Sequence, residues 1–251
     1  RYLPVLADGD KIGAFALTEP EAGSDPVSQV TTATRDGDHY VINGTKRFTT
    51  TGKNCGLVIV TAKTDENQRH KGISAFVVDK GTPGFKVGHT EDKMGLKASD
   101  TTDLIFDNCR VPAANLLGEE GQGFKIAMTA LDGGRIGIAA QSIGVAQAAL
   151  DASVKYAKQR EQFGQKISKF QGLRWMIADM ATELEAARQL ALSAAAMKDR
   201  GEKFTQRASM AKLFASEMVN RVAGKALQMH GGYGFVKDYP VERFYRDARV
   251  F

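Results

Sequence analysis

The spacing of apolar and polar residues changes its period near residue 115. Before that point, short apolar runs alternate with turn residues such as Asp36-Gly37-Asp38 and Thr82-Pro83-Gly84, which is typical of strands joined by tight turns. Asn43-Gly44 predicts a hairpin between two strands. No helical pattern separates the runs, which favours an antiparallel sandwich or barrel over a doubly wound sheet. Strands are predicted at 12–17, 30–34, 39–42, 45–50, 57–63, 73–79 and 102–109.

From Gln122 the apolar residues recur at helical spacing, and no proline between Pro112 and Pro240 interrupts a long helix. The pattern predicts helices at 123–159, 168–201 and 205–230, the second opened by a capping box of Ser168 and Gln171. Apolar stripes on the last two helices have the spacing of helices packed side by side. The stripes are Leu173, Ile177, Met180, Leu184, Ala187, Ala191 and Ala211, Ala215, Met218, Val222, Ala226, Met229.

The predicted fold class is therefore α+β, with two domains in sequence order. An antiparallel β-barrel or sandwich is expected at residues 1–115, and an antiparallel α-helical bundle at 116–251. The small residues of the stripes indicate close helix approach or subunit contacts. The 251 residues, of which 43% are hydrophobic, suffice to bury one large core or two modest ones.

Composition and charge exclude several classes of protein. No apolar run approaches the roughly 18 residues of a membrane span, and the opening residues lack the pattern of a signal peptide, so neither a membrane nor a secreted protein is expected. Residues 1–115 carry 14 basic and 15 acidic side chains, whereas residues 116–251 carry 20 and 14. The basic side chains are scattered among acids, which favours a phosphate-bearing ligand over nucleic acid.

The motifs of several enzyme classes are absent from the sequence. The sequence contains no G-x-G-x-x-G, Walker A, G-x-S-x-G or H-E-x-x-H motif. Two cysteines, Cys55 and Cys109, are expected to be reduced and half-buried. The four histidines, His39, His70, His89 and His230, are far apart in sequence, so no metal site is predicted.

Two glycine-containing segments remain as candidates for ligand binding. In Phe15–Asp25, Gly23 would allow close approach of a ligand, and the hydroxyls of Thr18 and Ser24 could bind it. An ordinary tight turn would use the same residue types. In Gln228–Phe235, a helix C-cap explains one glycine, but there are three in four residues. The charged residues that follow are also compatible with a solvated face.

Together these segments resemble the two signature regions of the acyl-CoA dehydrogenase family, and the second agrees over twenty residues, from Gln228 to Asp247. Further landmarks of the family occur in the right order, so the resemblance covers the whole chain. These are Asn43-Gly44-Thr45-Lys46, Lys93-Met94-Gly95, Gly121-Gln122-Gly123-Phe124, Leu131-Asp132-Gly133-Gly134-Arg135 and Arg160-Glu161-Gln162-Phe163-Gly164.

The resemblance implies a β domain followed by a helical bundle, with FAD held between them and an acyl-CoA thioester beside the isoalloxazine. Thr18 would bond the ring edge, and Ser24 would lie near both the pyrophosphate and the CoA. Phe48 stands where the family most often has Trp, so stacking is expected but an indole hydrogen bond is not. The flavin-lining residues implied in the first domain are Phe15, Leu17, Thr18, Gly23, Ser24, Phe48, Thr49 and Thr50.

Other matching residues would receive FAD from the neighbouring subunit, which couples cofactor binding to assembly as a homotetramer, a dimer of dimers. The guanidinium of Arg160 is suited to a pyrophosphate. Asp132 and Arg135 match positions that contact CoA, and Arg135 could instead be a structural ion partner of its helix. The implied FAD residues of the second domain are Arg160, Gln162, Phe163, Phe170, Gln171, Gln228, Gly231 and Gly232.

In the family a glutamate removes the α-proton, from one of two places. One matches Gly134, which cannot act as a base, and the other lies a few residues after Tyr245-Arg246-Asp247-Ala248-Arg249, past Phe251. Family members also carry a helical domain of roughly one hundred residues ahead of the position of Arg1. We therefore expect the sequence to cover the middle domain and most of the C-terminal domain, and we name no catalytic residue.

The implied activity is oxidation of a short-chain, butyryl-type acyl-CoA to the trans-2-enoyl-CoA, with electrons passed to an electron-transfer flavoprotein. The segments Leu131–Ala139 and Lys71–Phe76 carry the short-chain resemblance. The expected location is the bacterial cytoplasm or the mitochondrial matrix. Two alternatives stay open: an oxidase-like flavoenzyme that uses oxygen, and a non-catalytic module that binds acyl-CoA or scaffolds an oligomer.

Overall fold

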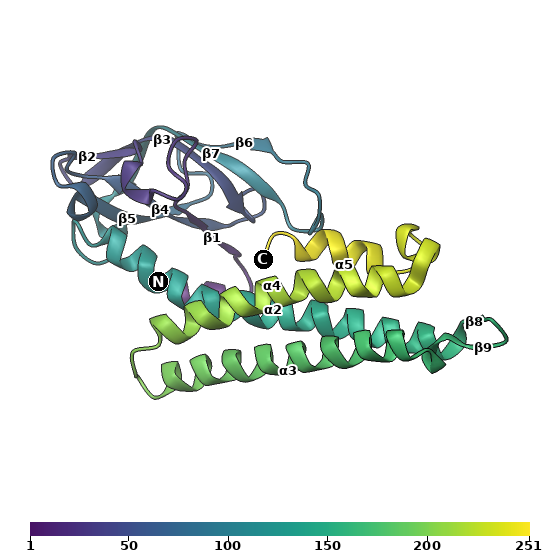
Figure 1. Cartoon of the computed structure of the whole chain (residues 1–251). Coiled ribbons are helices and arrows are strands. Elements are labelled where there is room, and N and C mark those ends of the chain that lie inside the picture. Colours follow the sequence, from purple (N-terminus) through teal and green to yellow (C-terminus); the bar gives the residue numbers. More distant parts are fainter. The chain divides into compact units, whose positions relative to one another are not determined.

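The computed structural model describes all residues from Arg1 to Phe251 and divides into two compact units. Unit 1 contains residues 1–93 and 97–129, and unit 2 contains residues 94–96 and 130–251. Unit 1 is built on a β-sheet, drawn in purple to blue in Figure 1, and unit 2 on long helices, drawn in teal to yellow.

Unit 1 contains a seven-stranded mixed sheet with the order β1-β4-β2-β3-β7-β6, and β5 pairs with β4. β1 and β2 run parallel to β4, whereas all other pairs are antiparallel. The predicted β domain is confirmed, but its sheet is mixed because the chain returns from β3 to place β4 beside β1. The strands are β1 Gly13–Ala16, β2 Thr32–Asp36, β3 His39–Thr50, β4 Leu57–Lys63, β5 Ile73–Asp79, β6 Phe85–Thr90 and β7 Thr101–Pro112.

The hairpin predicted at Asn43-Gly44 is wrong, because β3 runs through both residues. β7 pairs with β3 along its whole length, from His39 opposite Pro112 to Thr50 opposite Thr101, and the ladder keeps the chain extended. Gly44 lies at a register shift with φ +149°, so the sequence signal marks a bulge. The tight turn of this region is the one between Asp36 and His39.

Two elements of unit 1 were not predicted. The helix α1 (Tyr2–Ala7) contains no buried residue, and the edge strand β6 is at most half-buried, so neither has a strong apolar pattern. Short 3-10 turns at Pro26–Ser28, Arg69–Gly72 and Ala113–Asn115 complete the unit.

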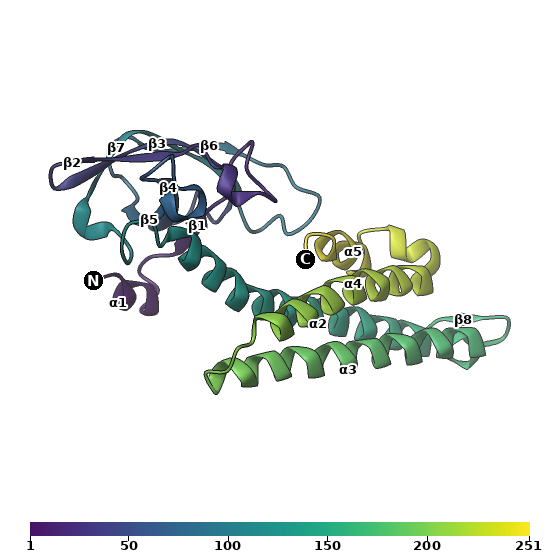
Figure 2. The same cartoon turned by 60° about the vertical axis from the view of Figure 1, so that its left-hand side comes forward.

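Unit 2 is a helical bundle in which α2 and α4 have the predicted ranges, α3 begins three residues later and ends two residues earlier than predicted, and α5 was not predicted. The helices are α2 Gly123–Gln159, whose first turns belong to unit 1, α3 Gln171–Asp199, α4 Thr205–His230 and α5 Val241–Ala248. Figure 2 shows α2, α3 and α4 as the long elements of the bundle. A small β8-β9 hairpin (Glu161–Gln162 and Gln165–Lys166) and the 3-10 turn Gly231–Phe235 connect helices.

The capping box predicted at Ser168 is wrong. Ser168 lies in the 3-10 turn Ile167–Lys169, and α3 begins after Phe170, which caps it without a side-chain hydrogen bond. Ile167 is buried in the bundle core, and burying it directs the chain through this extra turn before the helix starts.

The bundle core consists mainly of small side chains, as the stripes predicted. All six stripe residues of α4 and four of the six on α3 are buried, while Leu173 and Ile177 pack against the core at its edge. The alanines allow the helix backbones to approach closely. No helix of the structure combines the length and the apolar character that crossing a membrane requires.

The bulge at Gly44 provides a stability test. A Cβ at this residue would lie 2.3 Å from Thr31 Oγ1 and 2.7 Å from Thr31 Cα, whereas Gly37, also at positive φ, has open space around it. We expect Gly44→Ala to lower the free energy of unfolding by about 2–4 kcal/mol, and Gly37→Ala by about 1 kcal/mol. Urea unfolding of both variants checks this, and equal losses would contradict the bulge geometry.

Candidate cofactor-binding site

The turn that follows β1 is held by a lysine buried in β3. The Lys46 Nζ atom donates hydrogen bonds to the Leu17 carbonyl oxygen (3.0 Å), Glu19 Oε1 (2.7 Å) and Gln29 Oε1 (3.0 Å), and Thr61 Oγ1 lies 3.3 Å away. Thr61 in turn donates to Gln29 Oε1 at 2.9 Å. The ammonium group therefore has an acceptor for each of its three protons inside the protein.

Glu19 is bound from two sides. Besides Lys46, it accepts backbone hydrogen bonds from Val30 at 2.5 Å and from Thr31 at 3.2 Å. Burial alone would raise the pKa of Glu19, but the Lys46 ammonium and these hydrogen bonds outweigh burial and hold the pKa below its usual 4.5. Burial lowers the pKa of Lys46 to about 8 against the opposing effect of Glu19, so both groups are charged at neutral pH.

Phe48 is presented by a second irregularity of β3. The pairing with β7 shifts between Lys46 and Thr49, and Phe48 between them has φ +55°. Its ring is 54% exposed, and the Arg47 guanidinium carbon lies 5.0 Å from the ring centroid. Of the neighbouring predicted residues, Thr50 is exposed but Thr49 is buried. Phe48 and Thr50 are therefore open to a ligand, whereas Thr49 is covered.

The other predicted residues of unit 1 lie on the segment from β1 to the following turn. Phe15, Leu17 and Thr18 are half-buried, and Gly23 and Ser24 are exposed. A Cβ at Gly23 would meet nothing within 4 Å, so a ligand could approach its backbone. Reciprocal backbone hydrogen bonds between Glu19 and Ala22, at 3.0 and 3.1 Å, close the turn.

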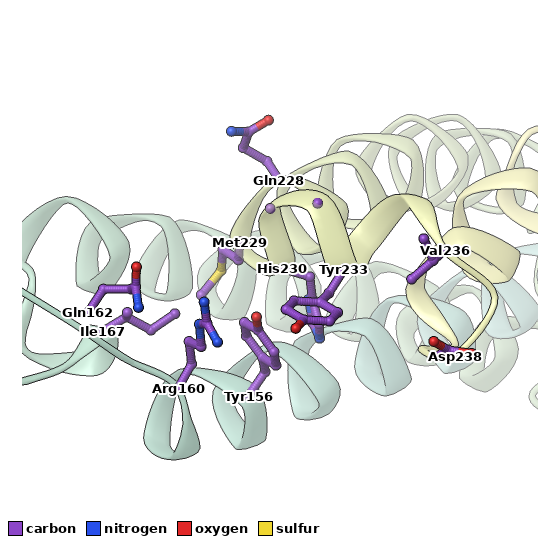
Figure 3. Close-up of a pocket in the computed structure, with 12 residues that line it drawn as sticks. Tyr156, Arg160, Gln162, Ile167, Gln228, Met229, His230, Tyr233, Val236 and Asp238 are labelled. Carbon is purple, nitrogen blue, oxygen red and sulfur yellow. The ribbon is translucent and has the colours of Figure 1, made fainter.

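In unit 2, five of the predicted residues meet at one pocket of about 570 Å³. Figure 3 shows Tyr156, in the last turn of α2, and Arg160, which directly follows α2, rising toward His230 at the end of α4 and Tyr233 in the 3-10 turn after it. Gln228 points away from them. The predicted residues at the pocket are Arg160, Gln162, Gln228, Gly231 and Gly232, and the others are Tyr156, Ile167, Met229, His230, Tyr233, Val236 and Asp238.

The chemistry of this pocket is that of an anion cradle with aromatic walls. The Arg160 guanidinium carbon lies 5.6 Å from the Tyr233 ring centroid. Gly231 has φ +58°, and a Cβ at Gly231 or Gly232 would meet nothing within 4 Å, so the backbone is open to a ligand. A guanidinium beside accessible backbone suits a phosphate or pyrophosphate group.

His230 belongs to the aromatic wall. Its ring stacks on Tyr156 with centroids 4.3 Å apart and meets Tyr239 at 5.5 Å, and Nδ1 lies 2.8 Å from the Ala226 carbonyl oxygen. Burial lowers the pKa of His230, so a neutral ring donating from Nδ1 fits this position. No group of three or more His, Cys, Asp or Glu side chains is arranged to hold a metal ion.

The remaining predicted residues of unit 2 lie outside the pocket. Phe163 is 91% exposed and meets Phe170 edge to face, with centroids 6.0 Å apart, and Gln171 is exposed at the start of α3. Arg135 forms an ion pair with Asp132, whose second oxygen accepts a hydrogen bond from Thr205 at 2.6 Å. Arg135 thus forms an ion pair within its own helix, which is the structural role that the sequence left open for it.

The landmark residues Met94-Gly95 have a structural role beside α5. The Leu96 amide donates to Asp247 Oδ1 at 2.7 Å, and Arg246 donates to the Met94 carbonyl oxygen at 2.9 Å. A Cβ on Gly95 would lie 2.4 Å from the Arg246 carbonyl oxygen. Only glycine fits this close approach.

Sequence reasoning missed several residues of these sites. Glu19 and Lys46 lie within family motifs, but nothing in the sequence shows that residues 27 positions apart form a buried pair. Tyr156 lies inside a predicted helix, and His230 has no histidine or cysteine near it in the sequence. The signal that could have found them is the aromatic residue one turn before Arg160 and the histidine directly before two glycines.

Unit 1 offers an exposed aromatic side chain at Phe48, and unit 2 offers an arginine beside open glycine backbone, which suit a flat ring system and a phosphate group. The family model "Acyl-CoA dehydrogenase, middle domain" matches residues 14–109, and "Acyl-CoA dehydrogenase, C-terminal domain" matches residues 121–251. The chain belongs to the acyl-CoA dehydrogenase family, whose members are FAD-dependent flavoproteins.

Two curated relatives match nearly the whole chain. Acryloyl-CoA reductase (NADH) of Anaerotignum propionicum is 55% identical over 99% of this chain and 64% of its own length. The short-chain specific acyl-CoA dehydrogenase of Clostridium acetobutylicum is 51% identical over 100% of this chain and 66% of its own length. The chain therefore spans slightly less than two thirds of the length of these relatives.

Two solved structures have the same fold. A chain in the structure titled for the electron transferring flavoprotein of Acidaminococcus fermentans superposes with a TM-score of 0.98 at 54% identity, covering 99% of this chain and 66% of that one. Butyryl-CoA dehydrogenase from Megasphaera elsdenii superposes with a TM-score of 0.98 at 50% identity, covering 99% and 65%.

The buried pair gives a pH-dependent prediction. Because the folded pKa of Glu19 lies below 4.5, its stabilising effect is present above that pH and is lost as the pH falls through the folded value. We expect Glu19→Gln to lower the free energy of unfolding by about 3–5 kcal/mol near pH 6.5, since Lys46 is left buried without its partner. The difference from wild type shrinks as the pH falls below 4.5 toward the folded pKa of Glu19. Denaturant unfolding in a pH series that runs below 4.5 checks this, and a pH-independent difference would contradict it.

Proposed function

We propose that the full-length protein is an FAD-dependent acyl-CoA dehydrogenase. It converts a short-chain acyl-CoA to the trans-2-enoyl-CoA and passes the electrons to an electron-transfer flavoprotein. The observation that carries the proposal is the pocket that brings Arg160 to the open backbone of Gly231 and Gly232 in a chain of this family. A pyrophosphate-bearing cofactor fits that donor set.

Different residues of this chain would bind different parts of FAD. Arg160 and the backbone of Gly231-Gly232 would bind the pyrophosphate, and Asp238, which also lines the pocket, is suited to a sugar hydroxyl. Thr18 would donate a hydrogen bond to the ring edge, and Phe48 would stack on the flavin. FAD supplies the acceptor for the hydride that leaves the substrate β-carbon.

The substrate would be held by its CoA portion. Asp132 and Arg135 are candidates for the pantetheine and its neighbouring groups, and Ser24 for the part nearest the flavin. Asp132 is already fixed by Arg135 and Thr205, so its carboxylate has a defined place from which to accept a hydrogen bond. Hydrogen bonds to the thioester carbonyl would stabilise the charge that develops as the α-proton leaves.

Names of relatives support the substrate class and the electron acceptor. One relative at 51% identity is named as short-chain specific, and one structural relative at 50% identity is a butyryl-CoA dehydrogenase. Another structural match, at 54% identity, comes from a study of an electron transferring flavoprotein. A short acyl chain and an electron-transfer flavoprotein are therefore the substrate and the partner we propose.

Assembly and location complete the proposal. We infer a homotetramer, a dimer of dimers, in which the pocket at Arg160 receives FAD of the neighbouring subunit. The nearly fully exposed Phe163 ring, three residues from Arg160, supports a contact there with a ligand or a second chain. Cys55 and Cys109 are both buried free thiols, in accord with the bacterial cytoplasm or the mitochondrial matrix.

The reverse direction is a second candidate, favoured by one comparison. The relative at 55% identity is named as a reductase of acryloyl-CoA. The same site would then deliver electrons to an enoyl-CoA, and the residues that bind FAD and CoA would keep their roles.

The activity is tested on the full-length protein without oxygen. We expect a visible flavin spectrum that bleaches on addition of butyryl-CoA, because electrons from the substrate reduce the bound cofactor, and that recovers when crotonyl-CoA is supplied. A protein that carries no flavin after purification and reconstitution would contradict the cofactor assignment. Bound flavin that responds to neither thioester would contradict the substrate class.

The cofactor role of Arg160 is tested by Arg160→Met. Removing a charged hydrogen-bond donor to a pyrophosphate is expected to weaken FAD binding by about 10- to 100-fold. Arg221→Met is the matched control, because Arg221 is a solvent-exposed arginine of the same bundle that pairs with Glu183 at 2.7 Å and does not line the pocket. Fluorescence titration with FAD measures both, and equal affinities for the two variants would contradict the role.

A further inference from the structure

Lys46 and Glu19 are set apart from all other ion pairs of the structure by their burial. Their side chains are 0% and 1% exposed, whereas every other pair has both partners at least partly open to solvent. Burying two charges carries a large desolvation cost, and apolar residues of similar volume often give an equally stable protein. The pair therefore calls for an explanation other than stability.

Three consecutive residues of the turn, Leu17 to Glu19, are held against β3 by hydrogen bonds from Lys46 and the residue after it. Lys46 binds the Leu17 carbonyl oxygen, the next amide, that of Arg47, donates to the Thr18 carbonyl oxygen at 2.8 Å, and Lys46 binds the Glu19 carboxylate. The turn is thus fastened to β3 at each residue. The Thr18 hydroxyl takes part in none of these hydrogen bonds. They therefore fix the backbone of the turn and leave that hydroxyl for another partner.

The same lysine borders the irregularity that presents Phe48. The register shift of β3 against β7 begins at Lys46, and Phe48 follows two residues later with φ +55°. Thr18 and Phe48 are the two residues assigned above to the edge and the face of the flavin. Both are positioned by chain segments that Lys46 holds together.

We propose that Lys46 and Glu19 are positioning residues for the flavin, because their buried ion pair fixes the Leu17–Glu19 turn on β3 and so sets the places of Thr18 and Phe48. The inference rests on the proposed function, since it presupposes FAD at this unit. Neither residue needs to touch the cofactor.

The test separates positioning from stability by removing both charges together. The double variant Lys46→Met with Glu19→Gln leaves no unpaired buried charge, so it is expected to fold with a melting temperature near that of wild type. If the pair positions the turn, the full-length double variant binds FAD at least about tenfold more weakly and shifts the flavin absorption bands.

Lys11→Met is the matched control. Lys11 pairs with Asp79 at 2.7 Å in the same unit, but this pair is partly exposed and holds no residue assigned to the cofactor. The control is expected to bind FAD as wild type does, with an unchanged spectrum. Loss of FAD binding in the control as large as in the double variant would overturn the inference, because any lost ion pair of unit 1 would then suffice.

The outcomes also distinguish the inference from the proposed function. Wild-type protein that fails to bind FAD removes the proposed function itself. Wild-type binding together with an unchanged affinity and spectrum in a folded double variant overturns only the positioning role.

If the double variant does not fold, the variant Thr61→Val tests the positioning role instead. It removes the hydroxyl that orients Gln29 in the Lys46 network and keeps both charges. An FAD affinity about two- to threefold weaker than that of wild type, with flavin absorption bands displaced from their wild-type positions, supports the positioning role, and wild-type values overturn it.

Discussion

The buried ammonium group of Lys46 is the constraint on which the arrangement of unit 1 depends. A charge with no access to water must find all its partners inside the protein, and here the partners come from the turn after β1, the segment before β2 and the strand β4. One side chain therefore ties together segments that are far apart in sequence. The turn rich in glycine and hydroxyl residues has a defined shape because the lysine leaves it few alternatives.

The arrangement of unit 2 depends on small side chains between its helices. Alanines fill the core of the bundle, so the helices can approach closely and the ends of α2 and α4 meet. That meeting places Arg160 beside a glycine pair whose backbone nothing covers. Aromatic rings, among them the stacked pair of Tyr156 and His230, form the remaining wall. The pocket thus forms where the C-terminal ends of α2 and α4 meet, and its glycines keep the backbone within reach of a ligand.

How much of this could be predicted from the sequence depends on the range of the interactions. The helices follow from local periodicity, and the boundaries of α2 and α4 were predicted correctly. The Asn43-Gly44 signal failed because β7, some 60 residues later, imposes a continuous ladder on β3, and the α3 boundary failed because burial of Ile167 outweighs a local cap. The residues named for FAD came from a resemblance, and the structure brings five of them to one pocket. The Lys46–Glu19 pair could not be predicted, since it exists only through tertiary contacts.

A crystal structure of the full-length protein purified with FAD would show most directly whether both units bind a single kind of cofactor. We expect the isoalloxazine edge at Thr18 with its face on Phe48, and a pyrophosphate bound by Arg160 and the Gly231-Gly232 backbone of a neighbouring subunit. A structure in which FAD binds elsewhere, with the Arg160 pocket open to solvent in the assembly, would contradict this expectation.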